Sequence, residues 1–181
     1  MSYIPPIQPA QTDAATRATL DAFKAKLGSY PNMFLTMAQT PVALNAYVQL
    51  ADVTTRGTLN AKQREQIALA VGDANACDYC LAAHSAIGAM VGLKPEQIAQ
   101  ARAAQAESAK DRALLQLAKR IVETRGRVPV AELDAFKAAG HSDATILEVL
   151  VNVVLNLYTN YTNHLAGTEI DFPAAPRALA A

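Results

Sequence analysis

The chain has little cysteine, no net charge and no long uninterrupted apolar run. Its 181 residues include only two cysteines, and 16 basic residues balance 16 acidic ones. This neutrality argues against an electrostatic nucleic-acid binder and against a polybasic membrane anchor, and it does little to oppose self-association. The most apolar stretch, 146–161, is interrupted by Glu148, Asn152, Asn156 and Asn160, so we do not expect it to span a membrane.

The first residues also lack the features of a secretory signal. Met1 to Pro6 contain neither a basic segment nor an apolar core, so cytoplasm is the expected compartment. There, a cysteine pair stays reduced unless it is catalytic or senses redox state.

The chain also lacks the alternating apolar and polar pattern of β-strands. Hydrophobic residues make up 51% of the chain and charged residues 18%, which is typical of a globular protein. Alanine is abundant and β-branched runs are short, so we predict an all-α fold, a single-domain multi-helix bundle over 1–181.

Prolines, glycines and capping residues place the expected helices at about 13–27, from 31, 41–55, from 61, 77–91, 95–104, 109–125, 130–138 and 143–165. Residues 1–12 should form an extended arm, 60–91 the core redox motif and 171–181 an extended tail.

Both cysteines fall in one short motif, C-x-x-C followed by a histidine. On a helix, Cys77, Cys80 and His84 are related as i, i+3 and i+7 and share a face. With Asn75 as N-cap, Cys77 would lie in the first turn, where helix amides favour thiolate. His84 is one turn from Cys80 and can act as its base. The dipole alone therefore favours Cys77 as the reactive thiol, whereas the position of His84 favours Cys80, which we adopt.

Three other interpretations of the motif compete with a redox dithiol. The cysteines can be ordinary small core residues beside a hydrogen-bonded histidine. They can bind zinc, with Glu65, His141 or His164 as a further ligand, although three ligands on one continuous helix is awkward geometry. A thioredoxin-like site is disfavoured because no strand precedes the motif.

A longer pattern surrounds the motif. Glu65 lies twelve residues before Cys77, and His84 lies four residues after Cys80. With its neighbours, residues 31–93, this block resembles the alkylhydroperoxidase D-like branch of the carboxymuconolactone decarboxylase-like family. The stretch 161–173 is similar to peroxidase-related members. Glu65 cannot be placed against the cysteines by helical spacing, because a break near 72–75 separates them, so a hairpin would have to bring it back.

The resemblance implies an all-α oligomer, commonly a trimer or hexamer, that acts as a peroxiredoxin-type alkyl hydroperoxide reductase. It implies antioxidant chemistry without haem, flavin or metal. Cys80 would attack the hydroperoxide, Cys77 would resolve its sulfenic acid as a disulfide, and Glu65 with His84 would relay protons. A dithiol, small molecule or protein, would reduce the disulfide. Some peroxidase members carry a second histidine inside C-x-x-C where this chain has Tyr79, which puts strong alkyl hydroperoxidase activity in doubt.

Two alternative functions stay open: a non-catalytic redox sensor or interaction module, and a carboxymuconolactone decarboxylase-type lyase. The lyase is disfavoured because the resembling decarboxylases do not rely on a cysteine pair.

The last expected helix carries a polar stripe at i+4 spacing on an otherwise apolar surface. Its members are Glu148, Asn152, Asn156, Asn160 and His164. A helix that is apolar around most of its girth is buried, in a core or between subunits, so these polar groups must be hydrogen-bonded. We expect a buried asparagine network that fixes helix pairing; the alternative is that Asn160 or His164 lines the active pocket.

Overall fold

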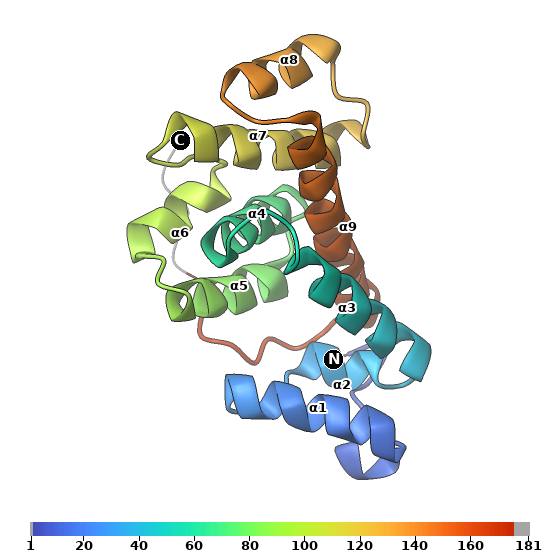
Figure 1. Cartoon of the computed structure of the whole chain (residues 1–181). Coiled ribbons are helices and arrows are strands. Elements are labelled where there is room, and N and C mark those ends of the chain that lie inside the picture. Colours follow the sequence, from blue (N-terminus) through green and yellow to red (C-terminus); the bar gives the residue numbers. More distant parts are fainter. Residues whose placement is uncertain (1, 176–181) are drawn as a thin grey trace.

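The chain folds as a bundle of helices, as predicted. The computed structural model describes residues 2–175, and in that range no residue is in a β-strand. The helices are α1 Ala14–Leu27, α2 Asn32–Met37, α3 Pro41–Thr54, α4 Ala61–Ala74, α5 Asp78–Met90, α6 Pro95–Arg102, α7 Ala109–Thr124, α8 Val130–Ala138 and α9 Asp143–Ala166. Figure 1 shows α4 at the centre, with the long α9 along one side and α1 and α2 at one end.

The helix starts follow from their capping residues. Asp13, Asn60, Ser108 and Ser142 each accept a backbone N–H of the first turn that has no partner within the helix. Pro31 is the N-cap of α2 rather than its first helical residue, a one-residue correction. The expected helix over 95–104 ends at Arg102.

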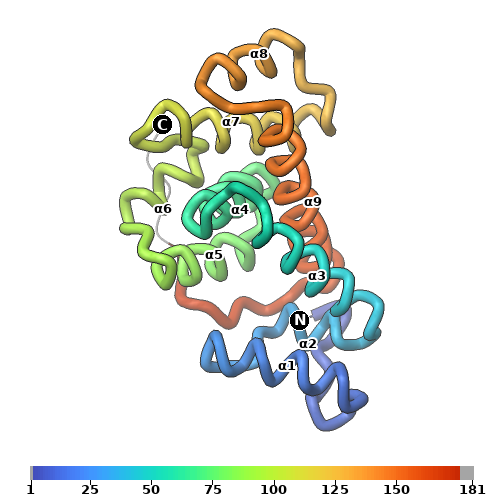
Figure 2. Tube along the Cα trace, in the orientation of Figure 1, coloured from blue at the N-terminus to red at the C-terminus, as the bar shows by residue number. Residues whose placement is uncertain are grey.

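The N-terminal arm and the C-terminal segment lie against folded parts of the chain. In the predicted arm, Pro9–Gln11 form a single 3-10 turn, and Tyr3 N donates to the Ala166 carbonyl at the end of α9. The chain after α9 passes between α5 and the α1–α2 pair (Figure 2). There Asn32 N donates to Asp171 Oδ2 at 2.7 Å. Residues 171–175 are in neither helix nor strand, and the rest of the predicted tail, 176–181, lies outside the described residues.

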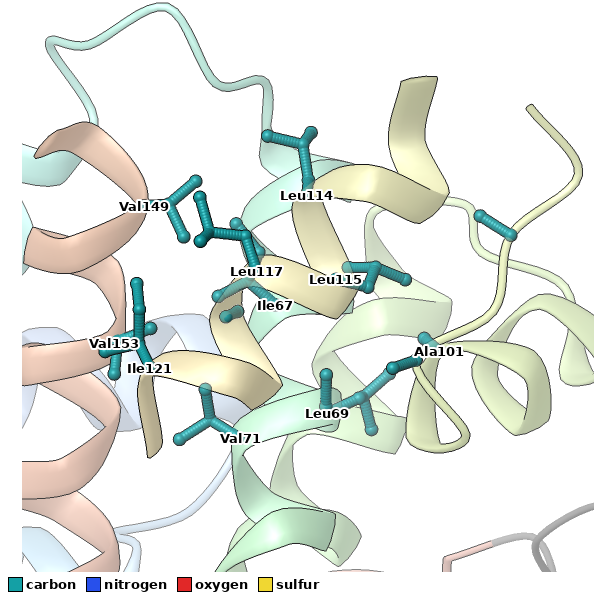
Figure 3. Packing of buried hydrophobic residues seen from close by; sticks show 14 of the residues in the cluster. Ile67, Leu69, Val71, Ala101, Leu114, Leu115, Leu117, Ile121, Val149 and Val153 are labelled. Carbon is teal, nitrogen blue, oxygen red and sulfur yellow. The ribbon is translucent and has the colours of Figure 1, made fainter. Parts of the chain in front are cut away.

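Helix α4 is the centre of the larger hydrophobic core. Ile67, Leu69 and Val71 are fully buried, and residues of α6, α7 and α9 pack against them (Figure 3). Seven consecutive residues of α4, 66–72, are buried, because this helix is surrounded by neighbours. A helix buried on all sides provides a rigid support for the Glu65 side chain at its edge.

A second, smaller cluster lies between α1, α2, α3 and α5. It contains Leu20, Phe34 and Leu44 together with Cys77, Cys80 and Tyr79. The two cysteines are thus part of the packing between the N-terminal helices and α5.

No single helix in residues 2–175 is long and apolar enough to cross a membrane. Helices α8 and α9 together reach the required length and composition, but the chain bends by 111° between them.

Candidate functional site

The turn between α4 and α5 places the cysteine motif. Helix α4 ends in a Schellman motif: Cys77 N donates to the Gly72 carbonyl and Ala76 N to the Asp73 carbonyl. Ala76 holds a positive φ of 52°, a left-handed conformation that costs an alanine about 1–2 kcal/mol. Asn75 is therefore the C-cap of α4 and not the N-cap of α5, which corrects the prediction.

Cys77 is itself the N-cap of α5. Its Sγ accepts the backbone N–H of Cys80 at 3.3 Å. The predicted arrangement of Cys77, Cys80 and His84 on one continuous helix is therefore wrong for Cys77, which lies just before the helix. Cys77 and Cys80 form a disulfide, with their Cα atoms 5.2 Å apart. Both side chains are buried, at 1% and 3% exposure.

The same turn brings Glu65 back against α5. His84 Nδ1 and Glu65 Oε2 are 2.8 Å apart, and both side chains keep about a fifth of their surface exposed, 21% and 18%. With Glu65 ionised, Nδ1 carries the ring proton and Nε2 is left as the basic nitrogen. The hairpin that Glu65 needed is thus present, and Cys80 lies one helical turn from His84.

A cavity of about 280 Å³ opens onto these groups. Cys80, His84 and Glu65 line it, whereas Cys77 does not. Much of the remaining wall is apolar or aromatic: Phe23, Leu27, Phe34, Tyr47, Ile87, Leu155 and Phe172. Burial, with a smaller contribution from the Glu65 charge, raises the pKa of Tyr47 to about 12, so its phenol stays neutral. The cavity is therefore suited to an apolar organic molecule that meets Cys80 and His84 at one wall.

Tyr79, inside the C-x-x-C motif, has a packing role in this chain. Its hydroxyl accepts the Met33 N–H at 3.2 Å, and its ring meets the edge of Phe172. Burial raises the pKa of Tyr79 far above its usual value, so the phenol cannot serve as a base near neutral pH. It ties α5 to α2 and to the C-terminal segment.

The sequence predicted a buried asparagine network that fixes helix pairing, and the structure divides its members. Asn160 Nδ2 donates to Cys80 Sγ at 3.0 Å, and Asn163 Nδ2 does so at 3.4 Å. Asn163 is not part of the i+4 stripe, and no sequence pattern had singled it out. Asn152 and Asn156 are buried but bond the carbonyls of their own helix, at Glu148 and Asn152, rather than pairing helices.

The remaining members of the stripe and the other histidine lie elsewhere. The Glu148 carboxylate accepts from Thr58 N and Leu59 N in the loop before α4. His164 is exposed. His141 stacks on Phe136 and bonds the Lys110 carbonyl, away from the cysteines. Within residues 2–175, no three His, Cys, Asp or Glu side chains are grouped so that they could hold a metal ion.

Comparison with known proteins identifies a similar family and similar folds. Residues 41–123 match the carboxymuconolactone decarboxylase family model. An alkylhydroperoxidase AhpD core structure, an uncharacterized peroxidase-related protein from Ralstonia eutropha JMP134, is 26% identical with a TM-score of 0.85, over 94% of this chain and 92% of that one. Residues 41–123 are therefore similar to the carboxymuconolactone decarboxylase family, and the chain as a whole shares the AhpD-like fold.

Two further structures share the AhpD-like fold. A peroxidase-related protein from Silicibacter sp. TM1040 is 20% identical with a TM-score of 0.80, over 97% of both chains. The debrominase Bmp8, in complex with 2,3,4-tribromopyrrole, is 18% identical with a TM-score of 0.81, over 94% of this chain and 92% of that one. No curated protein sequence matches significantly. Family and fold support a peroxidase-related or carboxymuconolactone decarboxylase-type role.

Proposed function

We propose that the protein is a thiol peroxidase, a dithiol-disulfide oxidoreductase that reduces organic hydroperoxides. The observation that carries this proposal is the cavity in which Cys80 shares a wall with the Glu65–His84 pair. A thiol needs a base to become nucleophilic, and His84, whose Nδ1 is engaged by Glu65 so that Nε2 is left to accept a proton, is one helical turn away. Cys77 is behind Cys80 and outside the cavity, where it can act only after Cys80 has reacted.

The first half-reaction oxidises the two thiols. His84 takes the Cys80 proton, and the thiolate attacks the terminal oxygen of the hydroperoxide. The O–O bond breaks, an S–O bond forms, and the departing alkoxide takes the proton from His84 to leave as the alcohol. Cys77 then attacks the Cys80 sulfenic acid, and the S–S bond forms as water leaves with the Cys77 proton.

The second half-reaction returns the enzyme to the dithiol. A dithiol reductant entering the cavity reaches the Cys80 sulfur, forms a mixed disulfide there and displaces Cys77. The Cys80 amide, which donates to Cys77 Sγ, stabilises the departing thiolate at the start of α5. The second thiol of the reductant then releases Cys80. We place this reaction in the cytoplasm, where dithiol reductants are available.

The proposal predicts stoichiometric thiol loss. One equivalent of cumene hydroperoxide should remove both titratable thiols of the reduced protein and yield one equivalent of alcohol. Hydrogen peroxide should react more slowly, because it cannot fill the apolar cavity. Thiols are counted with a chromogenic disulfide at intervals after mixing. Two titratable thiols remaining after excess hydroperoxide would rule the proposal out.

The same dithiol could instead switch a binding state without turnover, as a redox sensor. Steady-state consumption of hydroperoxide with dihydrolipoamide as reductant separates the two functions, because a sensor oxidises once and stops. Release of carbon dioxide from a lactone substrate would favour the lyase instead.

We also propose that the protein self-associates through α9. Five exposed apolar side chains on this helix fall within about 60° of one another and extend over about 27 Å, at 100° and 1.5 Å per residue; they are Leu147, Leu150, Val154, Tyr161 and Leu165. A stripe this narrow and long on a soluble helix is typical of an interface.

This proposal predicts a trimer or hexamer in solution, the states that the family implies. Val154→Glu should lower the mass measured by light scattering after size exclusion, because a charge would be buried at the interface. Val130→Glu, at an exposed residue of α8, is the matched control and should leave the mass unchanged. A monomeric wild-type protein contradicts the proposal.

A further inference from the structure

The Cys80 sulfur has two side-chain neighbours that the proposed mechanism does not use. Asn160 and Asn163 both point an amide nitrogen at it, from one face of α9 (3.0 and 3.4 Å). Both are almost completely buried, with exposures of 0% and 4%. Buried amide groups on a core helix normally bond backbone, as Asn152 and Asn156 do in this helix. These two bond sulfur instead.

The orientation of each amide follows from its other partners. Asn75 Nδ2 donates to Asn160 Oδ1 at 2.8 Å, which turns the Asn160 nitrogen towards Cys80. The Asn163 nitrogen lies 3.4 Å from both Cys80 Sγ and Met33 Sδ. Neither a disulfide nor a thioether sulfur carries a hydrogen, so each can only accept. The NH₂ group, not the carbonyl oxygen, must therefore face both sulfurs.

Asn163 is held in this orientation at a cost. Its Oδ1 is buried and has no hydrogen-bond partner among the described residues. An unpaired buried carbonyl is destabilising and needs an explanation, of which a functional role of the side chain is one. Neutral N–H···S bonds to a disulfide are weak, so they offset little of the cost of the unpaired Asn163 carbonyl. The same bonds become much stronger when the sulfur carries a negative charge.

We propose that Asn160 and Asn163 form a thiolate hole, a pair of amide donors that stabilises the Cys80 thiolate. Two donors aimed at the charged sulfur favour the ionised form over the thiol, as oxyanion-hole donors favour a developing charge. Because Cys80 is the third residue of α5, its own helix amides add to this field. Asn75 acts as a positioning residue through Asn160. His84 then removes a proton from a thiol that is already predisposed to ionise.

This inference rests on the proposed function for its role in catalysis, but its test needs no peroxide. In a Cys77→Ser background only Cys80 titrates, and its ionisation is followed by thiolate absorbance near 240 nm and by the pH dependence of iodoacetamide alkylation. We expect Asn160→Ala to move the midpoint upward by about one pH unit, a tenfold change in the thiol–thiolate equilibrium. Asn163→Ala should move it less, because its contact is longer.

Two further variants distinguish a direct effect on Cys80 ionisation from a general change in structure. Asn160→Asp keeps the shape of the side chain but places a carboxylate at the sulfur, so it should raise the midpoint more than Asn160→Ala. Asn156→Ala is the matched control, being equally buried on the same helix without touching sulfur, and should leave the midpoint in place. Circular dichroism confirms that each variant is folded.

The outcomes separate this inference from the proposed function. Midpoints of Asn160→Ala and Asn160→Asp that coincide with their parent overturn the thiolate hole, even if the wild-type protein reduces peroxide. Shifted midpoints in a protein that consumes no peroxide uphold the thiolate hole and reject the peroxidase.

Discussion

A Cys80→Ser variant should consume no organic hydroperoxide, with oxidation slowed by at least about 1,000-fold, since removing a nucleophile removes the chemical step. The structural reason is access: both cysteines are buried, but Cys80 lines the cavity and Cys77 does not. The serine hydroxyl fits the same space but does not ionise at neutral pH. The measurement is loss of cumene hydroperoxide under single-turnover conditions.

Cys77→Ser is the matched variant, and it should behave differently. It keeps an oxygen at the N-cap of α5, so the helix start is preserved. Cys80 should then react once at close to the wild-type rate and stop as a sulfenic acid, which dimedone traps and mass spectrometry assigns. If instead Cys80→Ser stays reactive and Cys77→Ser is inert, Cys77 is the attacking thiol, which is the assignment that the helix dipole alone favours.

The second large effect is expected at the Glu65–His84 pair. Glu65→Gln and His84→Gln should each slow oxidation of Cys80 by about 100- to 10,000-fold near neutral pH, the usual contribution of a positioned general base. The two residues act as one unit through the 2.8 Å contact, so the double variant should be little slower than either single one.

The pH dependence tests the role of this pair as a base. At alkaline pH the thiolate forms without His84, so the defect of both variants should shrink as pH rises. Glu96→Gln, at an exposed residue of α6 that does not line the cavity, is the control and should oxidise at the wild-type rate. A defect that is equally large at pH 7 and at alkaline pH would show that the pair shapes the cavity rather than moving the proton.

Much of the secondary structure could be predicted from interactions between residues that are close in the sequence. Capping side chains such as Asn60 and Ser142 satisfy the first amides of their own helix, so the helix starts follow from residues a few positions apart. The position of His84 one turn from Cys80 is equally local, because residues four apart lie on the same face of a helix. The placement of Asn75 and Cys77 was wrong because a Schellman turn with alanine in the left-handed position leaves no glycine in the sequence to mark it.

The site as a whole depends on contacts between distant segments. Glu65 and His84 meet only because the turn at Ala76 folds α4 against α5. Asn163 gave no signal in the sequence, since its partner lies 83 residues away. A polar side chain in an apolar helix predicts that some partner exists, but not which one.

By itself the sequence determined the helices, the membership of both cysteines in one motif and the thiol chemistry they can perform, because these depend on spacing within a helical turn or two. Only the tertiary structure decided that Cys80 faces the cavity while Cys77 lies behind it, and that two α9 asparagines donate to the Cys80 sulfur. Which face of a helix meets a cavity, and which distant side chain reaches a given atom, is set by how the helices pack.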